Sequence, residues 1–237
     1  MTTTTRLRLA DTGEAADLGA FLARLLRFDR AAAVRLQAVP GAVGRAEQGA
    51  QGGVLAVFGR LPLGGAGALA IRTARLVRLG GPLDTTVSAG QLLESVDQET
   101  GAFDVPAPVT GPAWAGLLPP RTGWQPAGAP SAYQVYPELM AAVGEFKERS
   151  EQVPEHHRTR RVLDELADEI WSRPLSAAPE VPLRAVHAAY VIGFLKPAVP
   201  LTVHRAGGWL RLSAPAGSVA VRRTAAPGAG LGLSPLS

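Results

Sequence analysis

The 237-residue sequence contains no cysteine, only two methionines, and few aromatic residues. The absence of cysteine excludes disulfides, thiolate nucleophiles, iron–sulfur clusters and cysteine-based zinc sites. No stretch approaches the roughly 18 uncharged apolar residues of a membrane-spanning helix, and the first residues lack an apolar core of signal-peptide length. We therefore expect a cytoplasmic protein without a membrane span.

Negative charge is missing from the last 57 residues, which hold six basic residues and no carboxylate. Residues 1–80 hold eleven arginines against five acids, and residues 81–180 hold seven bases against fifteen acids, so the three blocks carry +6, −8 and +6. Such blocks indicate either an anionic partner or basic ends that meet the acidic middle within one molecule. The arginine-rich composition also produces basic surfaces without any function.

A proline-rich segment divides the chain. Seven prolines fall between Val105 and Pro130, a density that predicts a linker or wrapping loop without helix or strand. We expect an α+β domain over 1–104, the linker over 105–130, a helical domain with a terminal meander over 131–223, and disordered tails over 1–5 and 224–237. Trp114 and Trp124 lie in the linker, where we expect them to pack on a surface and dock a protein partner.

The N-terminal half predicts an antiparallel sheet covered by helices. Leu18, Phe21, Leu22 and Leu25 repeat at helical spacing after Asp11, which predicts an amphipathic helix. Three alternating or apolar segments then predict antiparallel strands, and a capping box that starts at Ser88 predicts a short helix through Val96. The three strand segments are Val34–Val39, Val54–Phe58 and Leu69–Val77.

The C-terminal half predicts three helices. Pro137 is expected to open the first, and apolar residues at helical spacing are expected to face inward on all three. These residues are Leu139, Met140, Val143 and Phe146; Val162, Leu163, Leu166 and Ile170; and Leu183, Val186, His187, Tyr190, Val191 and Phe194.

The chain then predicts a three-stranded antiparallel meander. A two-residue turn at Gly207-Gly208 sets His204 opposite Arg211, and a second turn at 214–217 sets Trp209 opposite Arg222. One face of the meander is apolar and is expected to pack on the last helix. The other carries His204, Trp209, Arg211 and Arg222, which we predict to bind nucleic acid or another anion, with Trp209 stacking on a base.

Helices followed by a basic meander resemble the outline of winged-helix nucleic-acid binders, which implies that the meander contacts the phosphate backbone. The final helix lacks the outward polar residues of a recognition helix, so the resemblance concerns architecture alone. The alternative for this face is a cross-strand cation–π pair in which Arg222 covers Trp209 on an ordinary surface.

No pattern identifies a catalytic residue, a metal site or a cofactor site. His156 and His157 are adjacent and cannot share a metal unaided, and His187 lies in an apolar stripe typical of a buried, hydrogen-bonded core histidine. Residues 65–70 match a dinucleotide-binding motif, but the strand and helix that such a motif needs do not flank them.

We therefore expect a non-enzymatic regulatory or interaction protein whose basic meander binds an anionic partner, either nucleic acid or an acidic protein surface. The alternatives are a protein–protein adaptor with internal charge complementarity and, third, an enzyme that uses His187 or His204.

Overall fold

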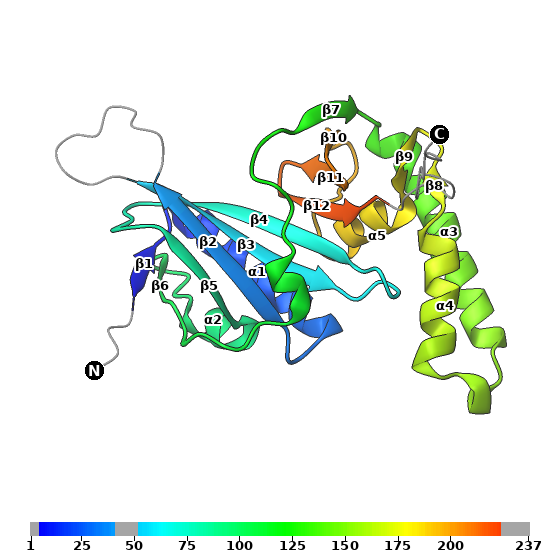
Figure 1. Cartoon of the computed structure of the whole chain (residues 1–237), viewed down its shortest axis with the longest axis horizontal. Helices are drawn as coiled ribbons and strands as arrows, with labels where there is room; N and C mark the ends of the chain where they lie inside the picture. The colour runs from blue at the N-terminus through cyan, green and yellow to red at the C-terminus, as the bar shows by residue number, and fades with distance from the viewer. Residues whose placement is uncertain (1–4, 41–51, 224–237) are drawn as a thin grey trace, which may run out of the picture.

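The computed structural model describes residues 5–40 and 52–223 of the chain (Figure 1). Its main element is an eight-stranded antiparallel sheet in the order β5-β2-β3-β4-β12-β11-β10-β7, with two two-stranded sheets, β1-β6 and β8-β9. The eight strands of the main sheet are β2 (Ala33–Pro40), β3 (Gly53–Leu61), β4 (Ala68–Leu76), β5 (Leu83–Ser88), β7 (Gln125–Gly128), β10 (Thr202–Ala206), β11 (Trp209–Ala214) and β12 (Gly217–Arg222). The small sheets comprise β1 (Arg6–Arg8), β6 (Ala102–Asp104), β8 (Pro174–Leu175) and β9 (Ala178–Pro182).

The main sheet spans both halves of the chain. Strand β12 pairs with β4, with Ala220 opposite Leu69 and Ser218 opposite Ile71. The expectation of an N-terminal sheet separate from the C-terminal meander is therefore wrong, and the meander is not a free wing of the winged-helix kind. A pairing between strands so distant in sequence leaves no local signal.

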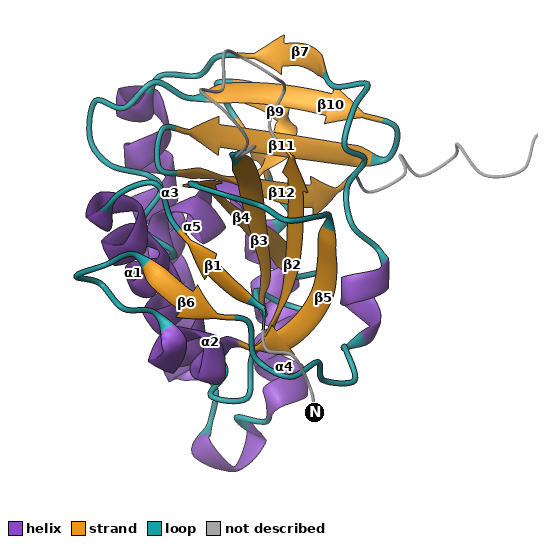
Figure 2. Ribbon diagram, turned by 90° about the vertical axis from the view of Figure 1, so that its left-hand side faces the viewer, coloured by secondary structure: helices purple, strands orange, loops and turns teal. Residues whose placement is uncertain are grey.

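The α-helices are α1 (Thr12–Phe28), α2 (Ala89–Ser95), α3 (Ala132–Gln152), α4 (Arg160–Trp171) and α5 (Leu183–Val191). Figure 2 shows that α1, α2, α3 and α5 gather on one side of the sheet. Helix α1 begins where the Asp11 side chain accepts a hydrogen bond from the Glu14 N–H, and α2 begins at Ser88 in the same way. Both helices follow the sequence prediction.

Helix α3 differs from the prediction at its start. Ser131 and Gln134 form a capping box, so the helix begins at Ala132 and Pro137 lies inside it. Two residues predicted to face inward are exposed, Met140 of α3 at 38% and Tyr190 of α5 at 40%. Helical spacing predicts a stripe, but the width of the stripe that is covered depends on neighbouring elements.

The proline-rich segment contains regular structure, contrary to the prediction. Residues Ala113–Gly116 form a 3₁₀ helix, η1, and β7 is the edge strand of the main sheet, where Gln125 lies opposite Arg205 of β10. Proline removes one backbone donor at a time, so a short edge strand tolerates it. The segment packs on the sheet face opposite the helices.

A buried arginine joins the two halves. Arg184 of α5 donates to the Leu63 carbonyl (3.0 Å) and to the Asp168 carboxylate (2.5 Å), which also accepts from the Gly65 N–H (2.9 Å). Residues 65–70, which match the dinucleotide-binding motif, form the end of the turn between β3 and β4 and the first residues of β4. The division into domains 1–104 and 131–223 stays a prediction, and the tail 224–237 lies outside the described residues.

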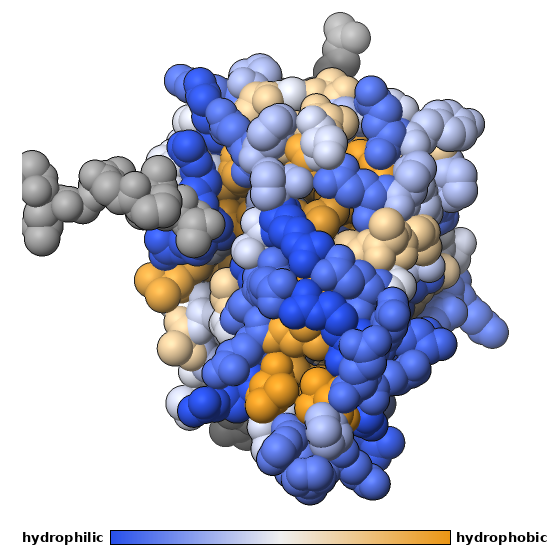
Figure 3. Space-filling view, turned by 90° about the vertical axis from the view of Figure 1, so that its right-hand side faces the viewer, coloured by the Kyte–Doolittle hydropathy of each residue, from blue (hydrophilic) through white to orange (hydrophobic). Residues whose placement is uncertain are grey.

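The surface that carries α3 and α4 is mainly hydrophilic, with small apolar patches between hydrophilic side chains (Figure 3). Arg149 and Arg173 link the two helices through Glu145 and Glu169. Hydrogen bonds from the two arginines lower the pKa of Glu145 to about 2. In the described part of the chain, no helix is long and apolar enough to cross a bilayer.

Candidate anion-binding face

Three tryptophans and three arginines gather on the sheet face opposite the helices. We call this surface the tryptophan–arginine face. Its residues come from β3, the proline-rich segment and the meander, and they are Arg60, Trp114, Trp124, Trp209, Arg211 and Arg222.

The meander has the register predicted from its two turns. His204 lies opposite Arg211, and Trp209 lies opposite Arg222. Successive side chains of a strand point to opposite faces of the sheet. Leu212 and Val219 therefore lie on the helix side, buried in the main core, whereas Trp209 and Arg211 lie on the other side.

Trp209 is 8% exposed and packs with Phe58, Leu69 and Ile71. The Arg222 guanidinium carbon lies 4.6 Å from the centre of the Trp209 ring. This is the cross-strand cation–π pair that the sequence left open as the alternative to ligand binding. With the ring covered, Trp209 offers little more than an edge to a ligand.

Arg211 makes a second pair of this kind. Its guanidinium carbon lies 4.2 Å from the Trp124 ring centre, and Trp124 Nε1 donates to the Pro120 carbonyl at 2.8 Å. Burial lowers the pKa of Arg211, although an arginine remains charged. Arg211 Nε and His204 Nδ1 are buried without a hydrogen-bond partner among the described residues.

Trp114 and Trp209 both line a cavity of about 300 Å³. Arg60 and Arg222 line it together with apolar residues, and Arg60 Nη2 donates to the Gly65 carbonyl at 2.9 Å. Aromatic walls with flanking guanidinium groups suit a flat, negatively charged ligand.

The arginines of this face have no acidic partner among the residues that the structure describes. The ion pairs formed within residues 5–40 and 52–223 involve neither Arg60 nor Arg211 nor Arg222. Stacking on an indole shields one side of a guanidinium without neutralising it. The face therefore keeps its positive charge.

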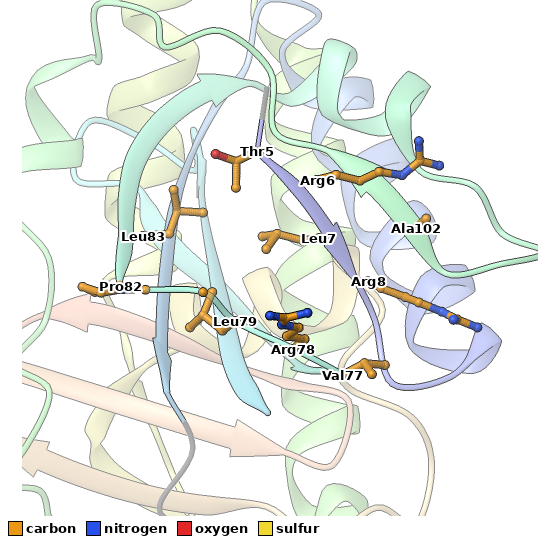
Figure 4. Close-up of a pocket in the computed structure, with 12 residues that line it drawn as sticks. Thr5, Arg6, Leu7, Arg8, Val77, Arg78, Leu79, Pro82, Leu83 and Ala102 are labelled. Atoms are coloured by element: carbon orange, nitrogen blue, oxygen red, sulfur yellow. The ribbon is translucent and has the colours of Figure 1, made fainter. Parts of the chain in front are cut away.

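A larger cavity, about 790 Å³, lies elsewhere, beside β1. Figure 4 shows Leu7, Leu79 and Leu83 around it, whereas the side chains of Arg6 and Arg8 extend away from it. Its polar groups do not converge, so its size does not make it the better binding site.

The histidines are dispersed. His187 stacks on Trp171 with 4.0 Å between ring centroids, and burial lowers its pKa to about 4. Its Nδ1 has no hydrogen-bond partner among the described residues, which differs from the hydrogen-bonded core histidine predicted. His156 and His157 lie together on an exposed turn, and within the described ranges no three histidine, aspartate or glutamate residues form a metal site.

The structure brings together residues that the sequence assigned to two separate sites. Trp114 and Trp124, predicted to dock a protein, lie against Trp209 and Arg211, predicted to bind an anion. Arg60 was missed. The one local indication of its role is that Arg60 lies two residues after Phe58 and therefore on the same face of β3. Nothing in the sequence predicts that β3 and β4 lie beside the meander.

Two family models match the chain. Residues 2–116 match the model described as Domain of unknown function (DUF8010), and residues 119–226 match the model described as Domain of unknown function (DUF8185). No curated protein and no solved structure matches. The two matched regions meet inside the proline-rich segment, so the chain joins two regions, each similar to a family of domains of unknown function.

Proposed function

We propose that this protein is a non-enzymatic interaction or regulatory protein that binds an anionic partner on the tryptophan–arginine face, with nucleic acid as the first candidate. The observation that carries the proposal is the cavity that Trp114 and Trp209 line together with Arg60 and Arg222, two arginines without a carboxylate partner among the described residues.

Single-stranded nucleic acid fits this surface better than a duplex. An unstacked base could stack on the Trp114 indole beside the edge of Trp209, and its phosphates suit guanidinium groups that have no carboxylate partner among the described residues. A duplex buries its bases and would leave the cavity unused. About three arginines are available for phosphates, so the affinity of one protein molecule should be modest.

The histidines support binding over catalysis. His187 is packed against Trp171 on the helix side, and His204 lies opposite Arg211 on the meander. Neither histidine takes part in an ion pair in the described part of the chain. A general base in a triad arrangement needs an orienting group and a nucleophile within hydrogen-bond reach.

The second candidate is the adaptor, and specific ion pairs favour it. Arg35 pairs with Asp84 at 2.7 Å, Arg184 with Asp168 at 2.5 Å, and Arg205 with Glu180 at 3.3 Å, so basic ends do meet the acidic middle. This neutralisation does not reach the tryptophan–arginine face. An acidic protein surface would therefore use the same three arginines.

Fluorescence anisotropy of the full chain tests the proposal. We expect a labelled random single-stranded oligonucleotide to bind, with a duplex of the same length binding more weakly. Affinity for the single strand should fall roughly 20-fold between 50 and 200 mM salt, as about three phosphate contacts predict. No binding at tens of micromolar protein would reject nucleic acid and favour the adaptor.

A charge-matched variant locates the binding. Arg60→Ala/Arg222→Ala should weaken binding at least tenfold, whereas Arg160→Ala/Arg161→Ala, which removes equal charge from exposed positions of α4, should change it less than twofold. Equal losses in both variants would mean that binding follows net charge and not this face.

A further inference from the structure

A second, polar cavity of about 370 Å³ lies beside the tryptophan–arginine face, where β4 continues past the β11-β12 turn. Among the residues that line it are two arginines, three hydroxyl residues and one acid: Arg72, Arg211, Thr73, Ser213, Ser218 and Glu14. Ser213 and Ser218 are cross-strand partners and share the face of Arg211.

Both arginines hold unused donors. The Nε atoms of Arg72 and Arg211 are buried and have no hydrogen-bond partner among the described residues. Leaving a buried charged donor unpaired costs free energy. Arg72 lies on the helix-covered side of the sheet, where its Nη atoms already bond Ala216, Glu14 and Asp17, so Arg211 is the arginine of this cavity whose acceptor the described residues do not supply.

The positive charge that this cavity offers comes from Arg211. Glu14, the one carboxylate among the lining residues, is bonded to Arg72 at 3.3 Å and Arg75 at 3.4 Å. Arg72 also bonds Asp17, but Arg211 has no carboxylate partner within the described ranges. Trp124 covers the flat side of the Arg211 guanidinium, which leaves its in-plane N–H groups for an oxyanion.

We propose that this cavity binds a phosphate group through Arg211, with hydroxyl donors from Ser213, Ser218 and Thr73. The inference rests on the proposed function and sharpens it. Ser213 lies four residues beyond Trp209 on β11, about 13 Å along the strand. One strand would thus place a base at the tryptophan cavity and a backbone phosphate here.

Arginine side-chain NMR tests the site with inorganic phosphate as the probe. The full chain, labelled with ¹⁵N-arginine, is titrated with phosphate at constant ionic strength, and Arg211→Lys identifies the Arg211 Nε–H signal. We expect that signal to shift and the Arg149 signal, whose guanidinium is bonded to Glu169, to stay. Equal shifts of both signals, or none up to tens of millimolar phosphate, would overturn the site.

Two charge-neutral variants complete the test. Ser213→Ala/Ser218→Ala should weaken phosphate binding about tenfold through lost hydrogen bonds. Thr73→Val, on the neighbouring strand, gives an independent readout if the double variant fails to fold. Unchanged phosphate affinity in a folded variant would overturn the role of the hydroxyls.

The two proposals fail separately. If phosphate shifts Arg211 but no oligonucleotide binds, the cavity stands as a phosphate site and nucleic acid is rejected as partner. If an oligonucleotide binds without any shift of Arg211, the tryptophan cavity stands and the phosphate site is rejected.

Discussion

On the helix-covered side of the main sheet, Arg72 and Arg184 are each bonded to a carboxylate. On the opposite face, Arg211 and Arg222 each lie over an indole ring. A carboxylate cancels the charge of an arginine, whereas an indole supports the side chain and leaves the charge in place. The first arrangement stabilises the fold, and the second keeps cations available for a partner.

The largest expected effect is the difference in the free energy of unfolding between substitutions at Leu212 and Arg211, two neighbouring residues of β11. Leu212→Ala removes a side chain that is 2% exposed in the main core and should lower the free energy of unfolding by about 2–5 kcal/mol. Arg211→Ala should cost about 1 kcal/mol or less and should instead weaken oligonucleotide binding. Urea unfolding measures both. A loss for Arg211→Ala as large as that for Leu212→Ala would assign this arginine to stability.

The pH dependence of stability should report His187. Its pKa is about 4 in the folded protein, below the usual 6.5, so the unfolded chain binds more protons between these values. The free energy of unfolding should therefore be highest above pH 6.5 and fall, by roughly 3 kcal/mol at most, as pH drops to 4. His187→Leu should reduce the slope in urea titrations at pH 7 and 4.5. An unchanged slope would refute this assignment.

The Arg184–Asp168 ion pair, which lies against the turn between β3 and β4, should matter less than the core. Asp168→Ala leaves the Arg184 guanidinium without its carboxylate and should cost about 2 kcal/mol. This is below the range for fully buried pairs because the Asp168 side chain is 42% exposed. Glu165→Ala, which removes an exposed ion pair on the same helix, is the control and should change thermal stability little.

The smallest effect concerns the cation–π pair. Arg222→Ala should lower the free energy of unfolding by about 0.5–1 kcal/mol, since Arg222 is exposed, lies over the neutral Trp209 indole and makes no ion pair within the described residues. A cost above 2 kcal/mol in urea unfolding would show that this arginine is structural and weaken the contrast between the two faces.

Local patterns predicted the meander and missed the sheet around it. The Gly207-Gly208 turn fixes which residues lie opposite one another, because a two-residue loop permits one register. The pairing of β12 with β4 and of β10 with β7 joins segments far apart in sequence, and such pairings follow from the packing of the whole chain.

The sequence likewise predicts the part of the candidate site that lies on the meander and not the part that other strands and segments contribute. His204, Trp209, Arg211 and Arg222 share a face for local reasons. Arg60 and Trp114 reach that face only because β4 joins β12 and the proline-rich segment crosses the sheet, which periodicity does not encode.

Ultraviolet crosslinking of a single-stranded oligonucleotide to the full chain, with adducts located by mass spectrometry, tests the central claim most directly. The account predicts adducts at Trp114, Trp124 or Trp209, lost in Arg60→Ala/Arg222→Ala. Adducts confined to the helix-covered side, or adducts that survive the double substitution, would contradict it.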